Sequence, residues 1–453
     1  MHIIVNIFVF FVTIFFLIMT HECGHFFIAR IFKVKILKFS IGFGKAIWQW
    51  QGKNNIEYAI GFLPFGGYVK MLDTREMQVA KSERHLALDQ KSFWQKMAVV
   101  LAGPLTNLLL GILAFWLMFV IGVKSPKPII GNVLPNSIAS QSGLHANGMI
   151  TAVDGIKTLT WHDVMLPLFL HLGDNDKVNL TVIDPITKQH NDYYLDLTNW
   201  RLDTNTFDFL GALGIEPYEP KIPAIVDKIQ KNSPAANSDL RLGDKIIKVD
   251  GVVISAWSEL LKYSRANPQK LLHIEVLRNG SVFFLDVLSA WKFGPNWKKI
   301  GYLGISPPKV EWPPAMLWQE QYSFGRALAE SFKQTSEFIV FNKVALQKLI
   351  TRKIPMSVLG GPISIFQSSA QALNQGLVVY IGFLAIFSIM LAFVNLIPIP
   401  GLDGGHILIF LLEGIIRRPI PVAVQVLLFK LGLIFLILLA VQATFNDLVR
   451  ILA

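Results

Sequence analysis

The chain has 453 residues, of which 52% are hydrophobic and only 16% are charged. Soluble domains carry about a quarter charged residues, so this composition favours a membrane protein. The net charge of +11 is compatible with nucleic-acid binding, but no basic cluster is interleaved with aromatic residues, which excludes that class. Cys23 is the single cysteine and excludes an internal disulfide bond.

The first apolar segment, residues 3–29, exceeds the roughly 20 helical residues that cross a bilayer. It contains an H-E-x-x-H sequence, in which His21 and His25 share one helical face and can bind zinc, with Glu22 beside them as general base. Polar groups at this depth usually mark function, although a hydrogen-bonded histidine pair at a helix end is the alternative. The segment lacks a basic n-region and an A-x-A-like site, so we expect it to be retained rather than cleaved as a signal peptide.

A β-rich loop at about residues 38–70 follows the first span. Residues 38–50 and 55–61 predict strands, and the proline and glycines of residues 62–67 predict a turn. We expect a hairpin or a small sheet near the histidine pair. Its edge either pairs with an unwound substrate or belongs to an ordinary cytoplasmic hairpin.

Three further apolar segments predict spans at about residues 97–123, 376–399 and 422–445. Pro104 and Asn107 interrupt the apolar run of the second span, and Lys430 in the fourth must snorkel or face the bundle. The sequence therefore predicts a polytopic α-helical membrane protein with four transmembrane helices.

The section after the second span contains an internal repeat. Residues 136–161 align without gaps on residues 232–257, an offset of 232 − 136 = 96 residues. Both copies carry an Asn-Ser-x-Ala sequence and a Val-Asp-Gly turn, a pattern that resembles PDZ domains. We expect two tandem PDZ-like α+β domains between spans two and three, at residues 124–217 and 218–310.

Each copy is followed by a Leu-Gly-Ile sequence, which contains Gly214 in the first copy and Gly304 in the second. Backbone amides in a PDZ carboxylate-binding loop can capture a C-terminus, so both glycines are candidate substrate-binding residues. A steric role is the alternative, in which the tandem domains exclude bulky substrates until another protease trims them.

Residues 311–362 predict an amphipathic helical connector, because aromatic and basic side chains are mixed along residues 316–350. This helix either lies at the membrane interface, which we favour, or packs against the second PDZ-like domain.

Asp403 follows the third span as an isolated acidic residue in a long apolar stretch. Prolines break the helix there and glycines allow close backbone approach, so the carboxylate can turn back toward the histidines. A catalytic zinc needs three protein ligands and one open position, and His21, His25 and Asp403 supply the three. The alternative is that Asp403 only caps a turn.

Charge on the connections predicts the topology. Residues 30–96 contain twelve Lys and Arg against five Asp and Glu, and the loop between spans three and four carries Arg417 and Arg418. Cytoplasmic loops are enriched in Lys and Arg, so both loops belong on the cytoplasmic side. The PDZ-like domains and both termini then lie on the opposite side, and the zinc site lies toward the cytoplasm.

Two motifs occur together: His21-Glu22-x-x-His25, and Asn395-x-x-Pro398-x-Pro400-x-Leu402-Asp403-Gly404. With these motifs, the order of spans and the duplicated module, the chain resembles the site-2 protease family, in its bacterial RseP-type branch of intramembrane zinc metalloproteases. By this resemblance Asn395, Pro398 and Pro400 are substrate-binding residues. For Asn395, an interhelical hydrogen bond is the alternative.

The resemblance implies a zinc cofactor and hydrolysis of a peptide bond within or beside a partner's transmembrane helix. It implies the second cleavage of regulated intramembrane proteolysis, for example of an anti-sigma factor, and clearance of remnant signal peptides. Substrates would be single-pass membrane proteins already cut on their extracytoplasmic side. The location implied is a bacterial inner membrane, with multiple spans and periplasmic PDZ-like domains.

Two rival classes are less consistent with these residues. A membrane-tethered scaffold with a vestigial zinc site would not need Glu22 as a general base. A zinc peptidase acting on soluble cytoplasmic peptides would not place all its zinc ligands at membrane spans. We therefore expect an intramembrane metalloprotease.

Overall fold

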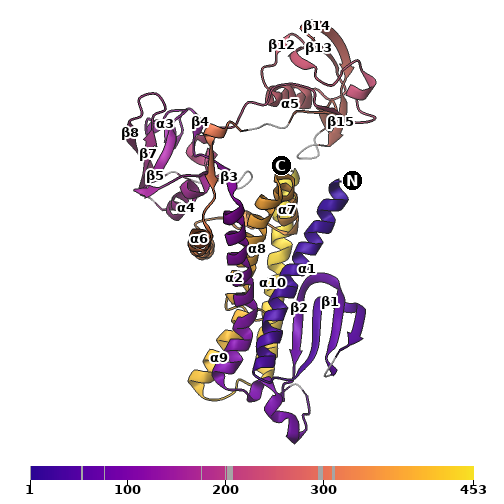
Figure 1. The fold of residues 1–453 in the computed structure, drawn as a ribbon, viewed down its shortest axis with the longest axis vertical. Coiled ribbons are helices and arrows are strands. Elements are labelled where there is room, and N and C mark those ends of the chain that lie inside the picture. Colours follow the sequence, from indigo (N-terminus) through magenta and orange to yellow (C-terminus); the bar gives the residue numbers. More distant parts are fainter. Residues whose placement is uncertain are drawn as a thin grey trace. The chain divides into compact units, whose positions relative to one another are not determined.

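The computed structural model describes residues 2–52, 55–75, 77–174, 176–198, 200, 208–293, 299–308 and 312–452 (Figure 1). The chain divides into two compact units: residues 1–124 with 319–447, and residues 125–318 with 448–453. Helices and a β-sheet form the first unit, and two small α+β modules lie in the second.

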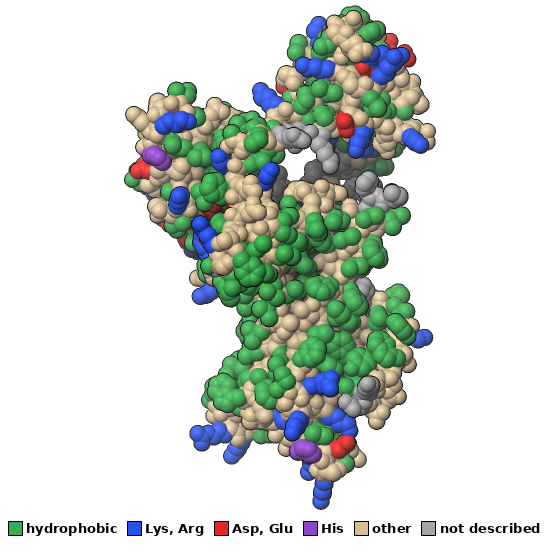
Figure 2. Space-filling view, viewed as in Figure 1, with side chains coloured by type: hydrophobic (Ala, Val, Ile, Leu, Met, Phe, Trp, Pro, Cys, Tyr) green, Lys and Arg blue, Asp and Glu red, His purple; other side chains and the backbone are tan. Residues whose placement is uncertain are grey.

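Within the described part of the chain, four helices are long and apolar enough to cross a membrane, which agrees with the predicted number of spans. They are α1 (His2–Ile31), α2 (Phe93–Ile121), α8 (Leu377–Leu396) and α10 (Val422–Leu452). Hydrophobic side chains cover much of the exposed surface of this helical part in Figure 2. Leu427 and Leu438 of α10, for example, are more than half exposed, as expected of side chains that face lipid. The α2 helix runs unbroken through Pro104 and Asn107, which interrupt the apolar sequence but not the helix.

Three further helices belong to the first unit: α6 (Phe324–Ile350), α7 (Pro362–Gln375) and α9 (Asp403–Ile416). The α6 helix packs on α2, where buried Ala327 joins the cluster that contains Phe115 and Met118. The indole Nε1 of Trp116 also donates a 3.0 Å hydrogen bond to the carbonyl of Phe324. A long helix is therefore present in the predicted connector, and its depth in the bilayer stays a prediction.

A carboxylate from the last span fixes the start of α7. Asp447 of α10 accepts hydrogen bonds of 2.9–3.0 Å from the amides of Gly361, Ile363 and Ser364. These amides have no partner within α7, and a negative charge at a helix N-terminus is also stabilised by the helix dipole. Asp447 thus ties the segment that leads into α8 to α10.

The loop between the first two spans forms a sheet from β1 (Ile36–Gln51) and β2 (Glu57–Met71). Phe39 of β1 pairs with both Tyr58 and Val69, so the start of β1 lies between the two halves of β2. The turn predicted at residues 62–67 is present as a reversal of the chain inside β2: Lys38 pairs with Glu57 and Lys70, and Ile41 pairs with Ile60 and Gly67, so the two halves of β2 run in opposite directions. Several register shifts and a φ of 97° at Gly66 let the strand bend while it remains paired.

The second unit contains two modules with the same strand order. The first comprises β4 (Ile130–Val133), α3 (Ile138–Gln141), β5 (Met149–Val153), β6 (Ile156–Lys157), α4 (Trp161–His171), β7 (Lys177–Ile183), β8 (His190–Asp196), η4 (Gly211–Leu213) and β9 (Ile215–Pro217). The second comprises β10 (Lys228–Ile229), η5 (Ala235–Asn237), β11 (Lys245–Val249), β12 (Val252–Val253), α5 (Trp257–Ala266), β13 (Leu271–Arg278), β14 (Ser281–Leu288), β15 (Ala290–Phe293), β16 (Lys299–Tyr302) and β17 (Ile305–Ser306). Their four-stranded sheets have the orders β6-β5-β7-β8 and β12-β11-β13-β14.

Residues that the sequence repeat aligns occupy matching places in the two modules. Asp154 and Asp250 have positive φ angles of 47° and 49° in the turns after β5 and β11. Trp161 and Trp257 begin α4 and α5. The sequence repeat is therefore a repeat of structure, whereas the predicted boundary at residue 217 stays a prediction.

The remaining elements are two short strands and several 3₁₀ turns. The strands β3 (Val123–Pro126) and β18 (Leu317–Glu320) pair where the chain leaves and re-enters the helical part. The remaining 3₁₀ turns are η2 (Lys81–Leu86), η3 (Leu88–Gln90), η7 (Pro314–Met316) and η8 (Met356–Val358).

Candidate metal centre

The H-E-x-x-H residues lie in the buried part of α1. His21, Glu22 and His25 are each less than 10% exposed. The two imidazoles lie one turn apart with ring centroids 4.9 Å from each other, as the i, i+4 spacing of a helix requires. Both histidines therefore present their Nε2 atoms to the same side of the helix, with these atoms 3.2 Å apart.

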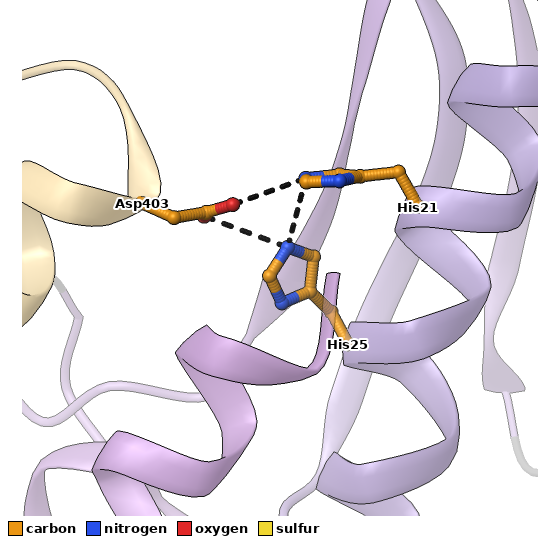
Figure 3. Close-up of side chains that lie close together, drawn as sticks. All are labelled: His21, His25 and Asp403. Atoms are coloured by element: carbon orange, nitrogen blue, oxygen red, sulfur yellow. Dashed lines mark hydrogen bonds and ion pairs between the residues drawn. The ribbon is translucent and has the colours of Figure 1, made fainter. Parts of the chain in front are cut away.

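Asp403 reaches the histidines because the helix is broken between α8 and α9. The α8 helix ends at Leu396, and Asp403 is the first residue of α9. A Cβ atom at Gly404 would overlap the carbonyl of Ile397, so only glycine permits this turn to close. Figure 3 shows the result, in which the Asp403 carboxylate points at both imidazoles.

The three side chains have the spacing of zinc ligands. Oδ2 of Asp403 lies 3.1 Å from Nε2 of His21, and Oδ1 lies 3.5 Å from Nε2 of His25. Two ligands at about 2.05 Å from a tetrahedral zinc are about 3.3 Å apart, which these separations match. Buried Oδ2 has no hydrogen-bond partner among the described residues, and a cation would satisfy it. Among the described residues, this is the cluster of three or more His, Cys, Asp or Glu that could hold a metal ion.

Two glycines allow α1 and α2 to approach closely at this centre. A Cβ atom at Gly103 of α2 would overlap Nε2 of His25, and one at Gly24 of α1 would overlap Oγ1 of Thr106. The sequence reasoning missed both residues. The signal was present as a glycine inside the H-E-x-x-H motif and a Gly-Pro pair within an apolar span, but neither indicates which helix it contacts.

The backbone of α2 orients one of the histidines. Nδ1 of His25 lies 2.8 Å from the carbonyl of Val99. A carbonyl only accepts, so Nδ1 carries the proton and donates it. The lone pair of the neutral ring is then on Nε2, the atom that faces His21 and Asp403, as a metal ligand requires.

The β2 strand lies against the predicted general base. A Cβ atom at Gly67 would lie only 2.9 Å from Cγ of Glu22. The absence of a side chain at Gly67 therefore lets β2 approach Glu22 closely. A substrate segment paired with this sheet would lie near the predicted base, and such pairing stays a prediction.

The other predicted substrate-binding residues of the membrane part lie in the turn that carries Asp403. Asn395 is half-buried in the last turn of α8, and its side chain makes no hydrogen bond among the described residues. Pro398 is exposed in the turn. The backbone of Pro400 contacts α10 so closely that a Cβ atom at Gly432 would overlap its carbonyl oxygen. Their part in substrate binding stays a prediction.

The two Leu-Gly-Ile loops differ in their backbone hydrogen bonds. In the first module, the amides of Leu213 and Ile215 donate to the carbonyl of Leu210, and the amide of Gly214 donates to Gly211. In the second module, the amides of Leu303 and Gly304 make no hydrogen bond among the described residues.

The loop of the second module also borders a cavity of about 150 Å³. Its walls include the basic side chains of Arg265 and Lys292 and the apolar side chains of Leu260 and Leu303. Two amides without partners, two cations and an apolar wall thus adjoin one cavity.

Comparison with known proteins gives concordant results. The model of peptidase family M50 matches residues 9–439 of this chain. The regulator of sigma-E protease RseP of Escherichia coli K12 is 39% identical over 435 residues, which cover 96% of each chain. Protease RseP of Yersinia pestis is 36% identical over the same coverage. A Vibrio cholerae protein described as a candidate zinc metalloprotease is 36% identical over 447 residues, 98% of this chain and 99% of that one.

Proposed function

The chain belongs to peptidase family M50, and on this premise we propose that it hydrolyses a peptide bond within or beside the transmembrane segment of a membrane-protein substrate. It is an RseP-type zinc metalloprotease with several membrane spans. The observation that carries the proposal is the buried cluster of His21, His25 and Asp403, which is built from α1 and the turn after α8. A protease whose metal ligands lie on membrane helices acts where those helices are.

The roles of the residues follow from their chemistry. His21, His25 and Asp403 would hold zinc, which lowers the pKa of a bound water to about 7 and polarises the scissile carbonyl. Glu22 follows one ligand directly in the sequence and is not needed as a ligand itself. Its carboxylate would accept a proton from the attacking water and donate it to the leaving amine.

Substrate class and orientation follow from the relatives and from charge. Relatives are named regulators of sigma-E, so we infer that the substrate is a single-pass membrane protein such as an anti-sigma factor, cut second in regulated intramembrane proteolysis. Remnant signal peptides are also single hydrophobic segments in the membrane, so we include them in the substrate class. The Lys and Arg excess of residues 30–96 favours a cytoplasmic-side active site in a bacterial inner membrane, with the two modules in the periplasm.

Detergent-purified protein should cleave a single-pass membrane peptide inside its hydrophobic segment, and a zinc chelator should abolish this cleavage. Mass spectrometry of the products locates the cut, and added zinc should restore it. Cleavage that persists after complete zinc removal would contradict the proposal. Cleavage confined to soluble peptides would favour the soluble-peptidase alternative.

We also propose that the second module captures the C-terminus of a trimmed substrate at Gly304, and that the first module does not do so at Gly214. The proposal is supported by the amides of Leu303 and Gly304, which have no partner among the described residues, and by the nearby cations. A carboxylate is recognised by such amides, and an apolar terminal side chain suits the cavity wall. In the first module the corresponding amides already donate within their own turn.

A fluorescent peptide with an apolar C-terminal residue should bind the full-length protein, and its C-terminal amide should bind more weakly. Arg265→Gln should weaken carboxylate binding roughly tenfold, because a charged hydrogen bond is lost. Lys262→Gln changes an exposed cation on the same helix without touching the cavity and serves as the control. Equal affinities for the free acid and the amide would leave the steric-filter alternative in place.

A further inference from the structure

The side chain of Asn107 is a buried polar group beside the metal centre, and it has no role in the hydrolysis proposed above. Asn107 is fully buried in α2, and its Oδ1 has no hydrogen-bond partner among the described residues. Its Nδ2 lies 3.5 Å from Nδ1 of His21. Buried polar atoms are normally hydrogen-bonded, so a buried carboxamide whose oxygen has no partner, while its nitrogen faces a histidine nitrogen, is unusual.

The position of Asn107 follows from the periodicity of α2. It lies four residues after Gly103, so both residues face the same side of the helix. Gly103 is the residue whose backbone packs against the rings of His21 and His25. The same helical face therefore presents a glycine to the metal-facing side of the imidazoles and an amide to the far side of His21.

The two histidines differ in the group that lies at hydrogen-bonding distance from Nδ1. His25 has the carbonyl of Val99, which can only accept, at 2.8 Å. Zinc binding through Nε2 of His21 likewise needs the proton on Nδ1, and that proton needs an acceptor. Asn107 is the residue whose side chain is recorded at this nitrogen. An amide turned by 180° places Oδ1 there in place of Nδ2, because the two ends of a carboxamide have the same shape.

We propose that Asn107 is a positioning residue that presents its side-chain oxygen to Nδ1–H of His21 and so holds the ring in the zinc-binding tautomer. The inference rests on the proposed zinc site. It is separate from helix packing, because the bond that ties α2 to α8 here runs from Oγ of Ser388 to the backbone carbonyl of Asn107, at 2.7 Å. That bond survives a change of the Asn107 side chain.

The test compares Asn107→Leu, which removes the acceptor, with Asn107→Asp, which keeps an acceptor and has no donor when ionised. Zinc affinity of the purified full-length proteins is measured by competition with a chelator, and thermal unfolding of each is followed in parallel. Asn107→Leu should weaken zinc binding roughly 10- to 100-fold, as is usual when a second-shell partner of a histidine ligand is lost. Asn107→Asp should restore it to within a few-fold of the wild type.

Two controls separate this role from a structural one. Leu109→Ala changes an exposed side chain on the same helix, away from the metal centre, and should leave zinc affinity unchanged. If Asn107→Leu folds poorly, ¹⁵N resonances of His21 in zinc-loaded wild-type protein report the tautomer directly, with a hydrogen-bonded proton expected on Nδ1. Wild-type zinc affinity in Asn107→Leu, or equal weakening in both variants, overturns the proposal while the zinc site stands. Wild-type protein that binds no zinc overturns both.

Discussion

Replacing Glu22 by glutamine should reduce peptide cleavage by about 10³-fold or more and leave zinc bound at one ion per chain. Glutamine has the size of glutamate but cannot accept a proton, and general-base catalysis typically contributes about 10²–10⁴-fold. The metal ligands are unchanged, because His21, His25 and Asp403 form the cluster without Glu22. Turnover of a membrane peptide and metal analysis on the same preparation measure both quantities.

The adjacent residue provides a matched control for this variant. Cys23 is half-buried on the same helix and takes no part in the metal cluster among the described residues. Cys23→Ala should therefore keep both zinc and cleavage. Glu22→Gln protein that cleaves at the wild-type rate would remove Glu22 as general base, and loss of zinc in that variant would place Glu22 among the ligands.

The spans and the cluster of candidate metal ligands could be predicted because each depends on local or topological signals. Four long apolar runs specify four helices almost without regard to their neighbours. The i, i+4 histidines define one face of a helix, and loop charge predicts that Asp403 lies at the same membrane depth. The structure brings these three side chains within 4.8 Å of one another.

The contacts that shape the centre could not be predicted, because they join segments that are distant in sequence. Gly24 and Gly103 are required by the crossing of α1 and α2, and a single sequence does not say which helix faces which. The reversal within β2 could be predicted only in part. Glycine and proline at residues 62–67 are typical of a turn, and the chain does reverse there, but pairing of both halves of β2 with the start of β1 could not be predicted from local signals.

Replacing Asp403 by alanine should remove zinc and cleavage together, unlike the change at Glu22. Alanine leaves only His21 and His25 as ligands, two where a catalytic zinc site has three. Zinc affinity should fall by more than the roughly 10- to 100-fold that loss of a second-shell partner costs. Chelator competition measures the affinity, and excess zinc should restore little cleavage, because the carboxylate that completes the site is absent.

A second carboxylate of α9, that of half-buried Glu413, shows whether loss of zinc reflects a lost ligand or only disturbed packing of the helix. Glu413 lies 3.6 Å from both Arg75 and Lys96 and accepts a 3.1 Å hydrogen bond from the amide of Ile420. Glu413→Gln should lower the thermal stability, because the half-buried Lys96 loses its ion pair and Arg75 keeps only Asp73, but it should keep zinc. If both variants lose zinc equally, α9 acts through its packing. If only Asp403→Ala loses zinc, the carboxylate at the start of α9 is a ligand, and the turn after α8 serves to bring it to the histidines of α1.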